Sequence, residues 1–209
     1  VKDESPMIVV AQKDGESEDP EPQDLYRWGT VVKILKVFKL PDGTKSAMVQ
    51  GLSRARVLDF VETDPYLRAA VQPAQEEEEA EGIDVEAMVS NLRGLFQQIV
   101  ELAPYLSAEH TMIALNTESA ARLTDVIGWN INASVEQKQE ILETVNIRKR
   151  LEIVTLLLSK ELQILELGNK IQDQVQDEIS KNQREYYLRE QMKAIQQELG
   201  EGDDESVLE

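Results

Sequence analysis

The first third of the chain alternates short apolar runs with turn signals, a pattern that predicts β-strands joined by turns. Strands are predicted at Met7–Gln12, Thr30–Leu40, Lys45–Gln50, Arg54–Val61 and Tyr66–Val71. A turn is expected at Pro41-Asp42-Gly43, because proline presets φ and glycine can take a positive φ. Since turns rather than helices join these strands, we expect an antiparallel sheet or partly open barrel over residues 1–75. The strand at Met7 comes so early that we expect this domain to lack its first strands.

The pattern changes to helical spacing after an acidic stretch over residues 76–83, which has the composition of a linker. A helical subdomain is predicted over residues 84–168. Its short helices are expected to begin at the capping residues Asp84, Ser107, Thr117 and Ser134 and to end near Ala103, Leu115, Ile131 and Glu143. Ser134 and Gln137 form the spacing of a capping box, and Pro104 ends the first helix.

One long helix is predicted from Asn146 to Leu199, since this stretch contains no proline and is followed by Gly200. At ~1.5 Å per residue it would run about 80 Å. Its first half carries an apolar strip that should pack on the short helices, whereas residues 169–200 are far more polar and are expected to project, ahead of an acidic tail at 201–209. A narrow stripe remains on the polar part and needs a partner, either another copy or a later part of the chain. Its members are Ile171, Val175, Ile179, Tyr186, Leu188, Met192, Ile195 and Leu199. The predicted fold class is α+β, an antiparallel sheet followed by a helical bundle that ends in one very long helix.

Composition narrows the possible classes of protein. The 209 residues are 41% hydrophobic, which is ordinary for a globular protein, and no apolar run approaches the ~20 residues that span a bilayer. No signal peptide is recognised, and the absence of cysteine fits a reducing cytoplasm, so we expect a cytoplasmic protein without membrane contact. The net charge of -18 gathers in acidic runs that read as solvated loops. Direct nucleic-acid binding is not expected, because no basic face is available to displace counterions.

Candidate chemistry is sparse. His110 is the only histidine, and a surface or packing role is expected for it. Carboxylate pairs such as Glu161 with Glu166 follow from acidic composition alone. The chain contains no P-loop, no G-x-G-x-x-G and no G-x-S-x-G pattern. We therefore expect no catalytic residue, no cofactor-binding residue and no metal ligand in this chain.

Two strings carry a family resemblance. The segments KLPDGTKSAMVQGLSRARV (39–57) and SKNQREYYLREQMKAIQQELGE (180–201) resemble the amino-terminal region of bacterial Lon protease, and MIVVAQK followed by DLYRWGTVVKIL is similar to it as well. The resemblance runs over essentially the whole chain, in the order β-rich substrate-recognition domain, helical subdomain and long helix. It implies that the full protein is an ATP-dependent AAA+ serine protease that assembles as a homohexameric ring and degrades misfolded and regulatory proteins. ATP and Mg are implied cofactors of that full protein, with the Walker motifs and the Ser-Lys dyad expected after Glu209.

A protease that selects unfolded chains needs a surface that accepts apolar segments with little sequence demand. Five apolar residues near strand ends or the hairpin are the candidates for that surface, with core packing as the first interpretation of each: Trp28, Leu35, Phe38, Leu40 and Met48. Trp129 and Tyr105 are helical candidates on the same terms. Contacts between copies are predicted at Tyr186, Tyr187, Leu188, Met192, Ile195 and Leu199. Two alternatives remain: a non-enzymatic scaffold that binds a folded partner, and, more distantly, an unrelated hydrolase that uses the carboxylates.

Overall fold

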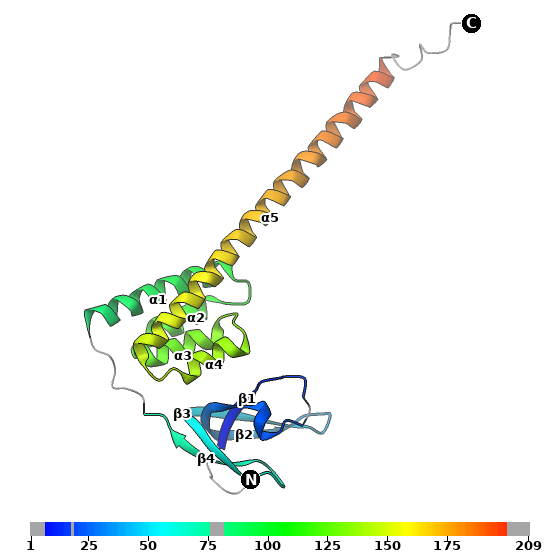
Figure 1. Cartoon of the computed structure of the whole chain (residues 1–209). Coiled ribbons are helices and arrows are strands. Elements are labelled where there is room, and N and C mark those ends of the chain that lie inside the picture. Colours follow the sequence, from blue (N-terminus) through cyan, green and yellow to red (C-terminus); the bar gives the residue numbers. More distant parts are fainter. Residues whose placement is uncertain (1–6, 18, 76–81, 200–209) are drawn as a thin grey trace. The chain divides into compact units, whose positions relative to one another are not determined.

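The structure is a computed structural model that describes residues 7–17, 19–75 and 82–199. Residues 76–81 of the predicted acidic linker (76–83) and the acidic tail at 201–209 lie outside the described residues, and Ile83, the last linker residue, is the first residue of a helix. By internal contacts the chain divides into two units, one up to Leu162 and one from Gln163 onward. The first unit contains a sheet and four short helices with the first turns of a fifth (Figure 1). This α+β order confirms the predicted fold class.

The sheet is antiparallel, with the strand order β1-β2-β3-β4. Its strands are β1 Met7–Gln12, β2 Leu25–Lys39, β3 Lys45–Glu62 and β4 Arg68–Pro73, and a 3-10 turn at Pro22–Asp24 precedes β2. The inner strands are much longer than the outer ones: 15 and 18 residues against 6 and 6. Two separate strands were predicted at 45–50 and 54–61, and this is wrong: β3 is continuous through Gly51-Leu52-Ser53, because β2 pairs with β3 on both sides of this segment, from Lys45 to Arg56.

Close packing of β1 on β2 depends on Gly29. A Cβ at this position would lie 2.3 Å from the Val9 carbonyl oxygen and 2.7 Å from Val10 Cγ1. The predicted turn also forms, with Gly43 at φ +88° and hydrogen bonds from Leu40 N to Thr44 O (2.8 Å) and from Gly43 N to Leu40 O (3.0 Å). Glycine fits both positions, one for space and one for its positive φ.

Five helices follow the sheet: α1 Ile83–Leu102, α2 Ala108–Asn116, α3 Ala120–Asn130, α4 Val135–Glu143 and α5 Ile147–Glu198. The predicted caps at Ser107 and Ser134 are confirmed; Ser134 Oγ accepts from Gln137 N at 3.3 Å, and Gln137 Oε1 accepts from Ser134 N at 2.9 Å. Two predicted caps are wrong. Gly82 is the N-cap of α1 in place of Asp84, and Ser119 is that of α3, because Thr117 ends α2.

The core lies mainly among the helices. Its fully buried apolar side chains come from α1, α3 and the first turns of α5: Leu92, Phe96, Ile99, Leu123, Ile127, Leu151, Val154 and Leu158. The sheet contributes far less, with Leu25, Val32, Ala55 and Val57 buried. Leu162 is the last buried residue of α5, and its described residues from Glu166 onward are exposed. Among the described residues, no helix combines the length and the apolar character needed to cross a membrane.

Candidate functional site: an exposed hairpin arm

The outer strands cover only part of the inner pair. Strand β1 pairs with β2 between Leu25 and Val32, and β4 pairs with β3 between Ala55 and Glu62. The pairing of β2 with β3 continues beyond both, from Lys33 opposite Gln50 to Lys39 opposite Lys45. Residues 33–50, which we call the hairpin arm, therefore form a two-stranded extension whose outer edges have no strand partner among the described residues. Such edges offer unpaired backbone N–H and C=O groups to another extended chain.

The arm is apolar as well as open. Leu35 is 54% exposed and Met48 is 53% exposed, and four further apolar side chains of the arm are exposed: Val37, Phe38, Leu40 and Val49. Leu35 sits at an irregularity where the register shifts between Ile34 and Lys36, and an extra residue of this kind increases the local bend and twist of a strand. Exposed apolar side chains that form one contiguous patch mark an interaction site, whereas single exposed apolar residues are ordinary.

The charge of the arm is opposite to that of the chain. It holds four lysines, Lys33, Lys36, Lys39 and Lys45, and one acidic residue, Asp42, which leaves a net charge of +3 in a chain of -18. The hydroxyl of Thr44, and then its backbone amide, hold the pKa of Asp42 below its usual value, so this carboxylate serves the turn. Lys36 Nζ lies 5.1 Å from the centre of the Phe38 ring, within the range of a cation–π contact.

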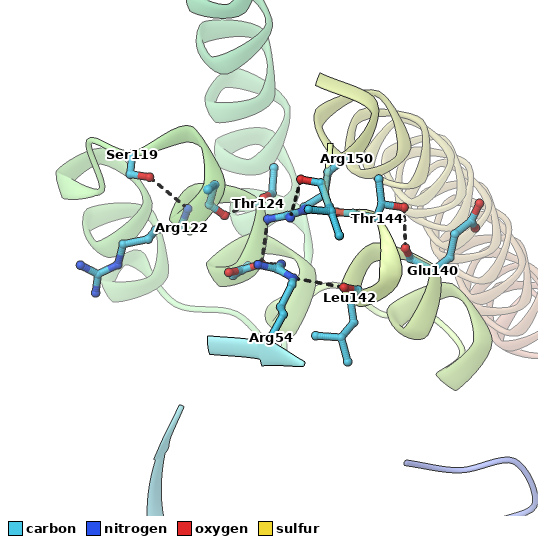
Figure 2. Close-up of polar contacts among 11 residues, drawn as sticks. Arg54, Ser119, Arg122, Thr124, Glu140, Leu142, Thr144 and Arg150 are labelled. Carbon is cyan, nitrogen blue, oxygen red and sulfur yellow. Dashed lines mark hydrogen bonds and ion pairs between the residues drawn. The ribbon is translucent and has the colours of Figure 1, made fainter. Parts of the chain in front are cut away.

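A cluster of arginines fixes the other end of β2 and β3 to the helices (Figure 2). Arg54 of β3 donates from Nε to Leu142 O at 3.1 Å and from Nη2 to Asp125 Oδ1. Arg150 of α5, whose side chain is fully buried, donates from Nε to Thr144 O at 2.7 Å and lies 3.8 Å from the same Asp125 oxygen. We call Arg54, Asp125 and Arg150 the arginine joint. Its one carboxylate couples the sheet to α3 and α5, and the hydrogen bond of Arg54 to Leu142 O couples the sheet to α4.

A second contact supports the joint. The side chain of Gln139 on α4 is buried, and its Nε2 donates to the Trp28 carbonyl at 3.1 Å and to Glu143 Oε1 at 2.8 Å. Because Trp28 pairs with Arg56 and Thr30 pairs with Arg54, these contacts lie on the same stretch of the β2–β3 ladder. The arm begins three residues beyond Thr30, so its base is held by the helices while its tip is not.

The predicted substrate residues separate into two groups. Leu35, Phe38, Leu40 and Met48 lie together on the arm and are exposed, so the first interpretation of them as core residues is wrong. The sheet is too narrow at that point to have an interior. Trp28 is half-buried and lies on the joint side of β2, away from the other four. The sequence analysis did not single out Val37, Val49 or the four lysines of the arm; their spacing with Leu35 and Phe38 was the signal.

The remaining candidates lie elsewhere. Tyr105 donates to Glu161 Oε1, which also accepts from Asn132 N at 3.2 Å, so both side chains brace the first part of α5. His110 accepts from Ser107 N through Nδ1 at 3.1 Å in the capping box of α2, which is a structural role. Trp129 is 80% exposed. All six predicted contact residues on the second half of α5 are exposed: Tyr186, Tyr187, Leu188, Met192, Ile195 and Leu199. Their role as contacts stays a prediction.

No group of three or more His, Cys, Asp and Glu side chains is arranged to hold a metal ion in the part of the chain that the structure describes. The carboxylates that do cluster serve salt bridges and caps, as in Asp84 with Arg148 and Glu62 with Arg68.

Comparisons with known proteins show what the chain is similar to. A family model described as the substrate-binding domain of ATP-dependent protease La (LON) matches residues 1–160. The Lon protease of Dictyoglomus thermophilum is 48% identical over 197 residues, which cover 94% of this chain and 25% of that protein. The Lon protease of Syntrophus aciditrophicus is 42% identical over 208 residues, or 99% of this chain and 26% of that protein. The chain thus spans about a quarter of the length of the curated relatives it matches.

A solved structure shares the fold. The N-terminal domain of the Mycobacterium avium complex Lon protease superposes with a TM-score of 0.57 at 21% identity, covering 73% of this chain and 90% of that one. At that identity the likeness concerns the fold alone.

Proposed function

The chain belongs to the family of Lon protease substrate-binding domains, and from that premise we propose that its hairpin arm captures extended segments of unfolded polypeptides for a longer protease. The observation that carries this proposal is the overhang of β2 and β3 beyond both outer strands. An incoming strand can pair with a free edge of the arm through backbone hydrogen bonds, which make little demand on sequence. The exposed apolar side chains add contacts that are equally tolerant.

This mode of binding explains how unfolded chains would be preferred to folded ones. Strand addition needs a segment whose own N–H and C=O groups are free, and a folded protein has used nearly all of them. The arm is only two strands wide, so it can contact one segment of an unfolded chain without meeting the neighbouring segments. A folded partner would instead need a broad complementary surface, typically about 800 Å² on each side.

Within the longer protein, we propose that the arm delivers captured chains to an ATP-dependent serine protease that removes misfolded and regulatory proteins from the cytoplasm. The names of the relatives support the protease itself, and the absence of cysteine supports the compartment. Catalysis and the binding of ATP and Mg are assigned to other residues of that protein, because this sequence holds no P-loop and no serine motif. We further propose that the exposed stripe on the second half of α5 contacts other copies of the chain in a homohexameric ring.

A binding assay with an unfolded carrier tests the proposal. A fluorescent protein ligand, permanently unfolded by reduction and alkylation, is titrated with the chain and compared with its native form by fluorescence anisotropy. The expected result is binding of the unfolded form only. The double variant Leu35→Ser/Met48→Ser should bind about tenfold more weakly, since it removes apolar area worth roughly 1 kcal/mol or more from a contact surface.

A matched control lies on the same strand outside the arm. Leu58 and Val61 are 55% and 65% exposed, so Leu58→Ser/Val61→Ser removes similar apolar surface from the other end of β3. This control should bind as the parent chain does. Equal weakening by both variants would place the site elsewhere, and tight binding of the native ligand would favour the scaffold that holds a folded partner.

A further inference from the structure

We propose that the hairpin arm prefers polypeptide segments in which acidic residues flank an apolar stretch. This inference rests on the proposed function, because it names which unfolded segments the arm would select. It starts from the contrast in charge: the arm carries +3, whereas the acidic runs at residues 14–24 and 76–86 lie before β2 and after β4. The arm is thus a local basic site on an acidic protein, and a negative segment is attracted there and repelled elsewhere.

The four lysines are available for a partner. Among the described residues, no carboxylate lies within ion-pair distance of Lys33, Lys36, Lys39 or Lys45, although ion pairs form at Arg54, Arg68 and Arg148. Each of the four side chains is exposed, so its ammonium group can move to meet a carboxylate without breaking an ion pair; Lys36 would leave only its contact with the Phe38 ring. The charge of the arm is therefore not balanced within the described fold.

The register adds an independent observation. Lys39 and Lys45 lie directly opposite each other at the end of the ladder, with side chains on the same face of the hairpin. Like charges in directly opposed positions destabilise a strand pair. A carboxylate that lies between the two ammonium groups would turn this repulsion into attraction. The pair thus costs the free arm stability that an acidic partner restores.

The apolar and basic groups also lie close enough for one segment to meet both. Lys36 pairs with Met48 in the ladder, and its ammonium stands over the Phe38 ring at 5.1 Å. A bound segment with an apolar side chain on Met48 and a carboxylate one or two residues away would therefore reach Lys36. This geometry requires acidic residues next to the apolar stretch, not merely somewhere in the same protein.

The range of electrostatic forces argues for a peptide rather than a nucleic acid. At an ionic strength of about 0.1 M the screening length is about 10 Å, so a short acidic segment on the arm feels mainly the local lysines. A long polyanion would extend beyond the arm and meet a chain of net charge -18. The arm has only four lysines, which also limits the number of phosphates that it could neutralise.

Three labelled peptides of about twelve residues test the preference, long enough for two to three ladder pairs on each side of the apolar core. They share one apolar core and carry flanks of Asp and Glu, of Ser and Gln, or of Lys. In about 50 mM salt, the acidic peptide should bind about three- to tenfold more tightly than the neutral one, the range expected for a few exposed ion pairs, and the Lys peptide most weakly. The variant Lys33→Gln/Lys36→Gln/Lys39→Gln/Lys45→Gln should lose this preference and keep its affinity for the neutral peptide within about twofold.

The control removes the same charge elsewhere. Lys160→Gln/Lys170→Gln/Lys181→Gln/Lys193→Gln neutralises four exposed lysines of α5 and should keep the preference. Equal affinity for all three peptides, or a preference that survives in the arm variant, would overturn the inference while leaving the proposed function intact. Failure of the proposed function has a different signature, namely neutral-peptide binding that Leu35→Ser/Met48→Ser does not weaken. Displacement of the acidic peptide by a single-stranded oligonucleotide at lower concentration than by unlabelled acidic peptide would overturn the inference in favour of a nucleic-acid site.

Discussion

Substitution of Asp125 by asparagine should loosen the sheet from the helices. Its carboxylate accepts from Arg54 and lies 3.8 Å from Arg150 Nη1, and the two guanidinium groups are 7% and 0% exposed. Asparagine keeps the size and one acceptor oxygen but removes the negative charge. Both arginines would then remain buried beside a neutral group, and their hydrogen bonds to the Leu142 and Thr144 carbonyls would stay.

The magnitude follows from burial. Removing one member of a fully buried ion pair costs about 3–5 kcal/mol, because a charge is left without compensation. Asp125 itself is 46% exposed, so water screens part of the interaction and the lower end applies. The carbonyl hydrogen bonds that stay reduce the loss further. We expect a loss of about 2 kcal/mol of unfolding free energy, equivalent to about 1 M in the urea midpoint at a slope of about 2 kcal/mol per M.

The two tryptophans allow the sheet to be followed separately. Trp129 is 80% exposed, so Trp129→Phe should change stability little. Trp28, which lies in the sheet, is then the single tryptophan of the chain. Urea unfolding is then recorded by Trp28 fluorescence and by circular dichroism of the helices. In the Asp125→Asn background the Trp28 transition should move to lower urea more than the helical one, because the helices retain their own apolar core.

Glu118→Gln is the matched control, since it removes one negative charge from an exposed side chain near α3. Its midpoint should stay within about 0.2 M urea of the parent, as for most surface substitutions. The reasoning is refuted if Asp125→Asn also stays within that range, because the joint would then carry no net stability.

Three further outcomes follow from the same structure. Gly29→Ala should destabilise the fold by about 2 kcal/mol or more, because the new Cβ would overlap the Val9 carbonyl oxygen. The control Gly94→Ala, on the open face of α1, should stabilise the fold by about 0.5 kcal/mol. Thermal unfolding of both variants distinguishes steric overlap from a general effect of alanine. Gly43→Ala should cost about 1 kcal/mol, since the position holds φ +88° with free space around it, and the same thermal measurement checks it. Burial, and then the hydrogen bond to Glu161, raise the pKa of Tyr105 above its ordinary 10.0, so the stability that this group contributes is complete below pH 10.0 and is lost as the pH rises toward the folded pKa. The urea midpoint should therefore decrease less between about pH 8 and about pH 10.5 in Tyr105→Phe than in the parent chain. An equal decrease in both proteins would refute this role of Tyr105.

Local signals in the sequence predicted most of the elements. The Pro-Asp-Gly turn, the capping box of α4 and the length of α5 depend on residues that are near one another in the chain, and all three are confirmed. One helical cap was missed because two capping residues, Thr117 and Ser119, lie within a few positions of each other. The structure settles that competition because the Thr117 hydroxyl donates back to Ile113 O at 2.8 Å and ends α2.

Long-range features could not be predicted in the same way. Arg54 of the joint contacts Asp125 and Leu142, which are 71 and 88 residues away in the sequence. The exposure of the arm is also a long-range property, because it depends on how far β1 and β4 extend along the inner strands. An apolar run such as that around Leu35 predicts a strand, but only the register shows that the neighbouring strand stops at Val32.

The two ends of the β2–β3 ladder thus have opposite physical demands. At the joint, the buried arginines and the Gln139 amide connect the sheet with three helices. A substitution that removes one of these contacts therefore lowers the stability of the fold. On the arm, apolar and cationic side chains lie in water with an unfavourable lysine pair, so truncating them removes little that the fold depends on. Stability and binding should therefore respond to different substitutions on the same two strands. An arm variant that lost binding together with its fold, or a joint variant that lost binding with its fold intact, would contradict this division.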